Sequence, residues 1–236
     1  MITPNKRVLA SFLTLETVLY ILILFVSLPL RSGTIHYASI LLVALLSWTV
    51  KDSSPRLAFI RGAMLFTVFA DLFLTYLRVE QWLGTVLFAC AQLAFAGRLI
   101  HDETRRFLWI GVRLIFVLFV FAIGLIVVKD AADLLFFTAL FYYANLLGNA
   151  FHALVRFSKV KLFAIGLLLY IGCDTLVGLS QSAGYITIAP TSLWYYLLHF
   201  PIDLVWFFYL PSQILLVVSS ISWISSKKIQ TKSIAG

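Results

Sequence analysis

The sequence predicts an all-α, polytopic membrane helix bundle with about eight transmembrane helices and both termini in the cytoplasm. Of the 236 residues, 62% are hydrophobic and only 12% are charged, a composition outside the range of soluble globular domains. The apolar residues form long runs between short charged segments, and a helix of roughly 20 apolar residues crosses a hydrocarbon core about 30 Å thick. The basic residues also alternate between the two sides of these runs.

Eight apolar runs are long enough to be membrane-spanning helices. They cover residues 8–30, 34–50, 57–79, 81–99, 107–128, 132–155, 160–181 and 200–224. The first run is followed by no small-residue cleavage signature and leads directly into further spans, so we expect it to be retained and not removed as a signal peptide. The longest polar connections are too short to hold a domain. We therefore expect residues 1–236 to form a single transmembrane domain, multi-pass in the cell membrane.

Lys and Arg residues set the orientation of a membrane protein, because they concentrate in short cytoplasmic loops. With the N-terminus inside, all 18 Lys and Arg residues lie on the cytoplasmic side of the predicted spans except Arg31, Arg78 and Lys129. An even number of spans then returns the C-terminus to the cytoplasm. This topology accounts for the net charge of +8, and no basic helix or aromatic RNA-binding pattern indicates a nucleic-acid partner.

The last apolar stretch is ambiguous because it is too long for one span. Pro201 and Pro211 lie within it, and proline can kink or break a helix. We interpret Trp194 and the two tyrosines after it as an interfacial aromatic belt that precedes the eighth span. His199 and Asp203 are then expected near the outer surface.

Acidic side chains within the predicted spans are the most informative residues, because insertion scales penalise each by about 2.5–3.5 kcal/mol and they usually mark sites. They are Glu16, Asp71 and Asp174, with Asp203 at the border of a span. Asp71 and Asp174 both lie about 21 Å from the cytoplasmic ends of their helices, so they share one depth. If they face each other, repulsion and desolvation keep one protonated while the other stays ionised, as a general acid and a general base require. Glu16 either belongs to a site or pairs with a loop arginine.

Four predicted helices each carry polar side chains along one face, which indicates a shared polar cavity. The four sets are Thr67, Asp71, Thr75 and Arg78; Gln81, Thr85 and Gln92; Tyr142, Asn145, Asn149 and His152; and Tyr170, Asp174 and Gln181. The neutral groups alternatively only tie helices together by hydrogen bonds. A structural tie rarely needs a carboxylate, so we expect the aspartates to belong to a functional site, whereas we expect His152 to be a satisfied interfacial histidine.

Motifs of soluble hydrolases are absent from the sequence. It has no HExxH, no Gly-rich phosphate loop and no GxSxG element, and its four histidines are scattered, which argues against a histidine-based metal site. Cys90 and Cys173 both lie within apolar runs, so we expect buried reduced thiols and not a disulfide or a metal pair.

Four short elements, taken in order, have the spacing of motifs in a known family. They are Ala70-Asp71-Leu72-Phe73-Leu74; Gly84, Phe88, Gln92 and Phe95; Gly166, Tyr170, Cys173 and Asp174; and Tyr209 with Gln213. They resemble the Gly-Asp, Gly-x3-Phe-x3-His-x2-Tyr, Gly-x3-Phe-x2-Ser-Asp and Tyr-x3-Gln motifs of the YhhN-like lysoplasmalogenase family. The resemblance covers most of the chain, roughly residues 60–220.

The resemblance implies a membrane-embedded hydrolase that cleaves the vinyl ether bond of lysoplasmalogens, with a membrane lysophospholipid as substrate and without a metal or organic cofactor. Asp71 and Asp174 would be its acid and base, in an order that stays open. Residues expected to orient water or substrate are Gln92, Tyr142, Asn145, Asn149, Tyr170, Tyr209 and Gln213. Arg78 would contact the phosphate head group at the outer mouth.

The chain departs from the family motifs at Gln92, where the family has histidine, and at Phe95, where it has tyrosine. If that histidine takes part in proton transfer, the activity is lost with it; if the two aspartates alone do the chemistry, it is kept. Two other functions therefore stay open. One is a non-catalytic lipid-binding or sensing protein, and the other is a proton-coupled carrier, against which the expected continuous helices around the aspartates argue.

Overall fold

The computed structural model describes residues 6–26, 32–50, 54–101, 103–128, 133–181 and 189–234, with the backbone alone for Lys6, Ser32 and residues 221–234. Within these residues all regular structure is helical, which confirms the all-α prediction. The helices are α1 (Lys6–Phe25), α2 (Ser32–Thr49), α3 (Pro55–Asp71), the π-helix η1 (Leu72–Leu77), α4 (Gln81–Ile100), α5 (Arg106–Val128), α6 (Leu134–Val155), α7 (Phe157–Gln181), α8 (Leu193–Leu198) and α9 (Leu204–Ile234). The eight predicted spans correspond to α1 through α7 and α9.

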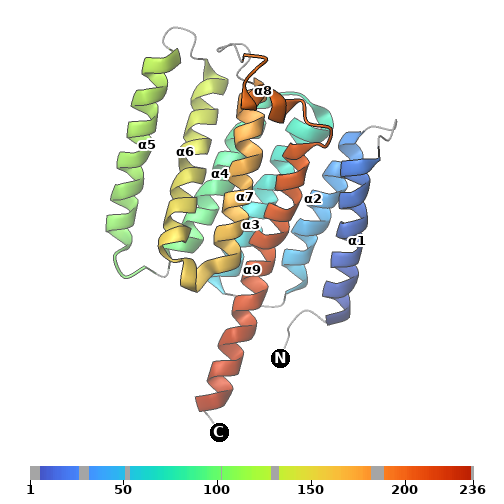
Figure 1. Ribbon diagram of the computed structural model, residues 1–236. Helices are drawn as coiled ribbons and strands as arrows, with labels where there is room; N and C mark the ends of the chain where they lie inside the picture. The colour runs from blue at the N-terminus through green and yellow to red at the C-terminus, as the bar shows by residue number, and fades with distance from the viewer. Residues whose placement is uncertain are drawn as a thin grey trace.

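Six of these segments are long and apolar enough to cross a membrane, namely α1, α3 with η1, α4, α5, α6 and α7. The other two, α2 and the Leu204–Ser220 part of α9, are shorter apolar helices. The long helices stand side by side, with α5 and α1 at opposite edges (Figure 1). Large apolar side chains on the outside of α5, such as Phe107, Ile115 and Ile126, are exposed. A surface of this kind fits a lipid environment, so the chain is a multi-pass membrane protein.

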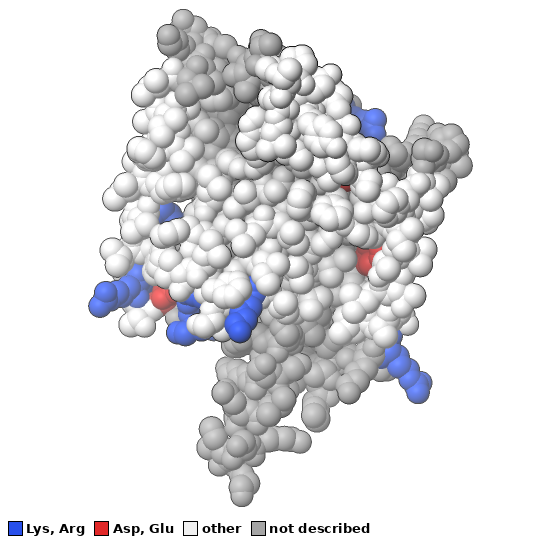
Figure 2. Space-filling model, in the orientation of Figure 1, with Lys and Arg blue, Asp and Glu red and all other residues white. Residues whose placement is uncertain are grey.

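α1 begins and α9 ends at one end of the bundle, which we call the termini end, and α8 lies at the other, the α8 end (Figure 1). On the face shown in Figure 2, most basic side chains gather toward the termini end, and a broad band above them is nearly free of charge. The predicted topology requires this distribution, and the cytoplasmic placement of the termini stays a prediction. Arg31, Lys51 and Lys129, which entered that prediction, lie outside the described residues.

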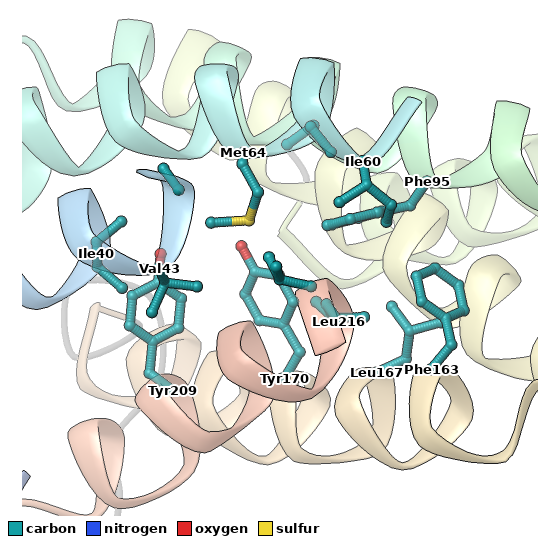
Figure 3. Packing of buried hydrophobic residues seen from close by; sticks show 14 of the residues in the cluster. Ile40, Val43, Ile60, Met64, Phe95, Phe163, Leu167, Tyr170, Tyr209 and Leu216 are labelled. Carbon is teal, nitrogen blue, oxygen red and sulfur yellow. The ribbon is translucent and has the colours of Figure 1, made fainter. Parts of the chain in front are cut away.

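The interior between α3, α4, α7 and α9 contains an apolar layer, made of Phe95, Phe163, Leu167 and Leu216 (Figure 3). The rings of Phe95 and Phe163 meet edge to face with centroids 5.7 Å apart, an arrangement that aromatic pairs favour. All four side chains have an exposed fraction of 0%. This layer separates the α8 half of the bundle interior from the termini end.

The third span changes from α-helix to π-helix directly after Asp71. The π-helix η1 ends at Leu77, and the next residue, Arg78, has a left-handed backbone (φ 57°) and donates its N–H to the Phe73 carbonyl five residues earlier. The helix thus continues without a break past Asp71, as expected, but with π-helical hydrogen bonding. Single π turns within α-helices are frequent at functional sites.

Two glycines let neighbouring helices approach η1 closely. A Cβ atom on Gly33 of α2 would lie 2.7 Å from the Thr75 backbone oxygen, and one on Gly84 of α4 would lie 2.4 Å from the Leu74 side chain. Contacts this short do not occur between real Cβ atoms and their neighbours. The absence of a side chain at both positions thus fixes how η1 packs, and with it the end of α3 that carries Asp71.

α9 continues through Pro211, which the sequence left as a potential break. Proline lacks an N–H, so the carbonyl of Phe207 four residues earlier loses its partner within the helix. The Tyr20 hydroxyl of α1 donates to this carbonyl oxygen at 2.9 Å. The proline is therefore accommodated by a bond that also ties α1 to α9.

The last span begins at Leu204 and not at residue 200 as predicted. Pro201 lies in the break between α8 and α9. The backbone N–H groups of Val205 and Trp206 donate to Asp203 Oδ1 at 3.1 and 3.2 Å, so Asp203 caps the first turn of α9. Asp203 is thus a helix cap at the α8 end and not a member of an intramembrane site.

Candidate active site

A cavity of about 500 Å³ lies among α3, η1, α4, α6, α7 and α9, within the size range of small-molecule sites. Near the α8 end it is lined by residues at or next to helix ends, namely Gln81, Leu135, Gln181 and Val205. From there it extends along the helices to Asp71 and Asp174, which both line it. The cavity therefore brings the two intramembrane aspartates of different helices together in the α8 half of the bundle.

Asp71 is held by two hydroxyl donors. Tyr209 Oη of α9 donates to its Oδ2 at 2.6 Å, and Thr75 Oγ1 of η1 donates to its Oδ1 at 3.2 Å. Thr75 follows Asp71 by four residues, the separation that brings side chains together on a helix. Both carboxyl oxygens are thus engaged, which fixes the orientation of the carboxyl group at the cavity wall.

Asp174 is held by a tyrosine as well. The Tyr142 hydroxyl of α6 donates to Asp174 Oδ2. The neighbouring Tyr143 hydroxyl instead lies 2.8 Å from Thr175 Oγ1, a pair in which either atom can donate. Each aspartate therefore has its own tyrosine from a different helix, Tyr209 for Asp71 and Tyr142 for Asp174.

Aromatic rings close the cavity on the side of the termini end. The Phe88 ring stacks on Tyr142 at a centroid distance of 5.6 Å and meets Tyr209 edge to face at 6.4 Å. Trp206 lies 5.2 Å from Tyr209 in the same edge-to-face manner. Phe88, Tyr142 and Tyr209 line the cavity, whereas Tyr170 is fully buried behind them. The two tyrosines that bind the aspartates are thereby fixed by ring contacts.

The cavity has the groups for acid–base chemistry. Among its described lining residues the two aspartates are the acidic groups, and Lys, Arg and His are absent. A pair of carboxyl groups in largely apolar surroundings is a common arrangement for general acid and base catalysis. Within the described part of the chain, no group of three or more His, Cys, Asp and Glu residues could hold a metal ion.

Three of the residues expected to orient water lie outside the cavity lining, in a separate buried network. Asn149 Nδ2 donates to the Gln92 side-chain and backbone oxygens at 2.9 and 2.8 Å. The Arg113 guanidinium donates to the side-chain oxygens of Asn149 and Asn145 at 2.7 and 3.1 Å. The network joins α4, α5 and α6. Arg113, which was counted with the cytoplasmic charges, has a buried side chain within this network, and its side of the membrane stays a prediction.

The remaining predicted site residues either line the cavity, are buried outside its lining, or are exposed. Tyr142 and Tyr209 line the cavity, whereas Tyr170 and Gln213 are fully buried and do not. Arg78 is exposed in the turn after η1 and is not among the lining residues. Its contact with a head group stays a prediction.

Two titratable residues that the sequence pointed to, Glu16 and His152, lie away from the cavity. Glu16 is buried in α1, and neither of its carboxyl oxygens has a hydrogen-bond partner within the described residues, so the pairing with a loop arginine is not observed there. His152 stacks on Trp109 with centroids 3.8 Å apart, and its Nε2 lies 3.1 Å from Glu103 Oε1. His152 Nε2 thus has an acidic partner, but the side chain is fully buried and its Nδ1 has no hydrogen-bond partner within the described residues, so the expectation of a satisfied interfacial histidine is wrong.

Several cavity residues were not singled out from the sequence. Trp206 and Tyr143 line the cavity, and both stand in apolar runs whose periodicity does not separate an inward ring from a lipid-facing one. Cys173, expected from the sequence to be a buried thiol, also lines it directly before Asp174. Both cysteines are free thiols, but only Cys173 is buried, whereas Cys90 is half-buried.

The family model for the YhhN family matches residues 33–220. No curated protein and no solved structure matches the chain. The matched segment runs from α2 to the apolar part of α9 and contains every described residue of the cavity. The resemblance inferred from the sequence motifs is confirmed, and the family is generally known as lysoplasmalogenase-like. The chain belongs to the YhhN family.

Proposed function

We propose that this protein is a membrane-embedded hydrolase that cleaves the vinyl ether bond of lysoplasmalogens, with Asp71 and Asp174 as its acid and base. The observation that carries the proposal is that two carboxyl groups from different helices line one cavity inside the bundle. Membership of a family generally known as lysoplasmalogenase-like supports the substrate class.

The reaction needs two proton-transfer groups and one water. One aspartic acid donates its proton to the vinyl carbon farther from oxygen, and the double-bond electrons form the new C–H bond, which leaves an oxocarbenium ion. The other aspartate, as carboxylate, stabilises that cation and accepts a proton from the water that adds to it. The hemiacetal then collapses to a fatty aldehyde: its hydroxyl proton passes to the first aspartate as the C=O bond forms, its C–O bond breaks, and the leaving oxygen takes the proton held by the second aspartate, which restores the starting protonation. Paired carboxylates use the same logic in glycoside hydrolysis.

The tyrosines supply the orientation that this chemistry requires. Tyr209 and Thr75 hold Asp71, and Tyr142 holds Asp174, so neither carboxyl group has to be ordered when the substrate binds. Fixed catalytic groups lower the entropic part of the barrier. This arrangement favours a catalytic use of the aspartates over a structural tie between helices.

The cavity also has suitable surfaces for the two parts of a lysolipid. Its amide and hydroxyl groups near the α8 end, from Gln81, Thr85 and Gln181, suit a glycerol and phosphate head group. Apolar walls suit the alkenyl chain and come from Leu74, Leu135, Ala139 and Val177. Gln92, which replaces the family's histidine, does not line the cavity, so this departure leaves the acid–base groups of the lining in place.

The proposal is tested with matched lysolipids. Purified protein is incubated in D2O with lysoplasmenylethanolamine or with the saturated 1-alkyl analogue of the same chain length, and the products are measured by mass spectrometry. We expect aldehyde from the vinyl ether alone, with one deuterium on the carbon next to the carbonyl at early times. Authentic aldehyde incubated in D2O controls for exchange. Well-folded protein that releases no aldehyde from the vinyl ether, or consumes both lipids equally, contradicts the proposal.

A further inference from the structure

Three fully buried polar side chains in the bundle interior each leave one atom without a hydrogen-bond partner among the described residues. The atoms are Thr67 Oγ1, Gln92 Nε2 and Gln213 Oε1. The Tyr170 hydroxyl interacts with the Tyr142 hydroxyl that binds Asp174, and all four residues have an exposed fraction of 0%. An unmet buried polar group costs about 1–3 kcal/mol, and buried groups of native proteins are nearly all satisfied by protein or by ordered water. The three unmet atoms together indicate a shared partner.

These four residues lie at one level of the bundle. Each stands four residues from a side chain that lines the cavity, on the same helix and toward the termini end. The pairs are Thr67 with Asp71, Gln92 with Phe88, Tyr170 with Asp174, and Gln213 with Tyr209. Side chains four residues apart share a helix face, and one turn rises about 5.4 Å. The four polar groups therefore form a ring one turn below the cavity, contributed by α3, α4, α7 and α9.

The surroundings of this ring separate it from both lipid and loops. On the cavity side, the Tyr170 ring packs 5.6 Å from Tyr209 and 6.3 Å from Phe88. On the side of the termini end lies the apolar layer that contains Phe95 and Phe163. Figure 3 shows the Tyr170 hydroxyl pointing across the interior toward Met64 of α3, the helix that carries Thr67. The four polar side chains thus lie between the aromatic residues of the cavity and the apolar layer.

The hydrogen-bonding capacities of the ring are complementary to water. Gln92 Nε2 is a donor, Gln213 Oε1 is an acceptor, and the hydroxyls of Thr67 and Tyr170 are both. A buried water typically makes two to four hydrogen bonds to otherwise unmet groups. We infer that this ring is a water-binding site, which holds water one helical turn from Asp71 and Asp174 and supplies the molecule consumed in hydrolysis. The supply role rests on the proposed function, whereas the water site itself does not.

The proposed reaction explains why water bound at this ring would be useful. Each turnover consumes one water, yet a lysolipid that fills a largely apolar cavity displaces water from the aspartates. Water held behind Tyr209 and Tyr170 is on the opposite side from the cavity residues nearest the α8 end, so bound substrate does not displace it. The ring then positions a reactant without touching the substrate, which makes its members positioning residues.

The water site is tested without any activity measurement, by X-ray radiolysis of the full chain in detergent followed by mass spectrometry. Hydroxyl radicals formed from a bound water oxidise the side chains next to it, so we expect Met64 and Tyr170 to be modified although both are fully buried. Thr67→Val should lower Met64 oxidation several-fold. Thr138→Val is the matched control, because the Thr138 hydroxyl bonds the Leu135 carbonyl of its own helix, and it should leave Met64 oxidation unchanged.

Unmodified Met64 and Tyr170 in the folded wild-type protein would overturn the water site, as would equal Met64 oxidation in Thr67→Val and wild type. Thermal melting checks that each variant is folded, and Gln213→Met serves as a second ring variant. These outcomes are independent of turnover, so they differ from a failure of the proposed function.

The supply role has its own readout in an active preparation. Methanol competes with water for the oxocarbenium ion and gives a mixed acetal in place of the aldehyde. We expect the acetal-to-aldehyde ratio to rise several-fold in Thr67→Val relative to wild type and Thr138→Val, because delivery of water is impaired and entry of methanol is not. An unchanged ratio overturns the supply role.

Discussion

Replacing Tyr209 by phenylalanine removes one hydroxyl from the cavity wall and keeps the ring. That hydroxyl donates to Asp71 at 2.6 Å, a short bond to a group that carries charge during the reaction. Hydrogen bonds to charged groups contribute about 1.5–3 kcal/mol, and each 1.36 kcal/mol corresponds to about tenfold in rate. We therefore expect Tyr209→Phe to lower kcat/KM for the vinyl ether about 10- to 150-fold.

The assay is aldehyde release at subsaturating lysoplasmenylethanolamine, compared with Tyr143→Phe. Tyr143 lines the same cavity, but its hydroxyl pairs with Thr175 at 2.8 Å and not with an aspartate. The control variant should therefore retain most of the activity. The ring contacts of residue 209 with Tyr170 and Trp206 survive the change, so the thermal midpoint should move little. Equal losses in both variants, or full activity in Tyr209→Phe, would refute this reasoning about how Asp71 is held.

Three further predictions concern the helix contacts, the departure from the family motif and the absence of a cofactor. Tyr20→Phe leaves the Phe207 carbonyl without a donor and should cost about 1–2 kcal/mol of unfolding free energy. This cost is measured by denaturation in mixed micelles. It should be smaller in a Pro211→Ala background, where the N–H of residue 211 binds the same carbonyl. Gln92→His should change kcat/KM by less than about tenfold, because residue 92 lies outside the cavity lining and histidine keeps an N–H donor for the water-binding ring. A gain of several orders of magnitude would contradict that placement. Aldehyde release should be unaffected by exhaustive treatment with EDTA, and activity restored by an added metal ion would refute a metal-free mechanism.

Most of the fold was predictable because membrane-spanning helices are recognisable in a sequence by their length and apolar composition. The eight predicted spans correspond to α1 through α7 and α9, six of them long apolar segments and two of them shorter ones. The exceptions arise where backbone hydrogen bonds, and not hydropathy, decide the geometry. Pro211 sits inside α9 because Tyr20 supplies the missing donor, and α9 begins at Leu204 because Asp203 caps it. The π turns after Asp71 likewise depend on tertiary packing against Gly33 and Gly84.

The candidate site was predictable only in part, for a related physical reason. A carboxyl group in an apolar span is costly enough to be noticed in the sequence, and both aspartates line the cavity. Helical periodicity assigns a residue to a face but does not say which neighbour that face meets. On the polar face of α6, for example, Tyr142 binds Asp174 of the cavity, whereas Asn149 binds Arg113 in the separate network.

The most direct test of the account is aldehyde release from lysoplasmenylethanolamine by purified wild-type protein beside Asp71→Asn and Asp174→Asn. Asparagine keeps the size of the side chain and removes its proton-transfer chemistry, so both variants should fold and both should lose nearly all turnover. Full activity in either folded variant would contradict the paired-aspartate mechanism.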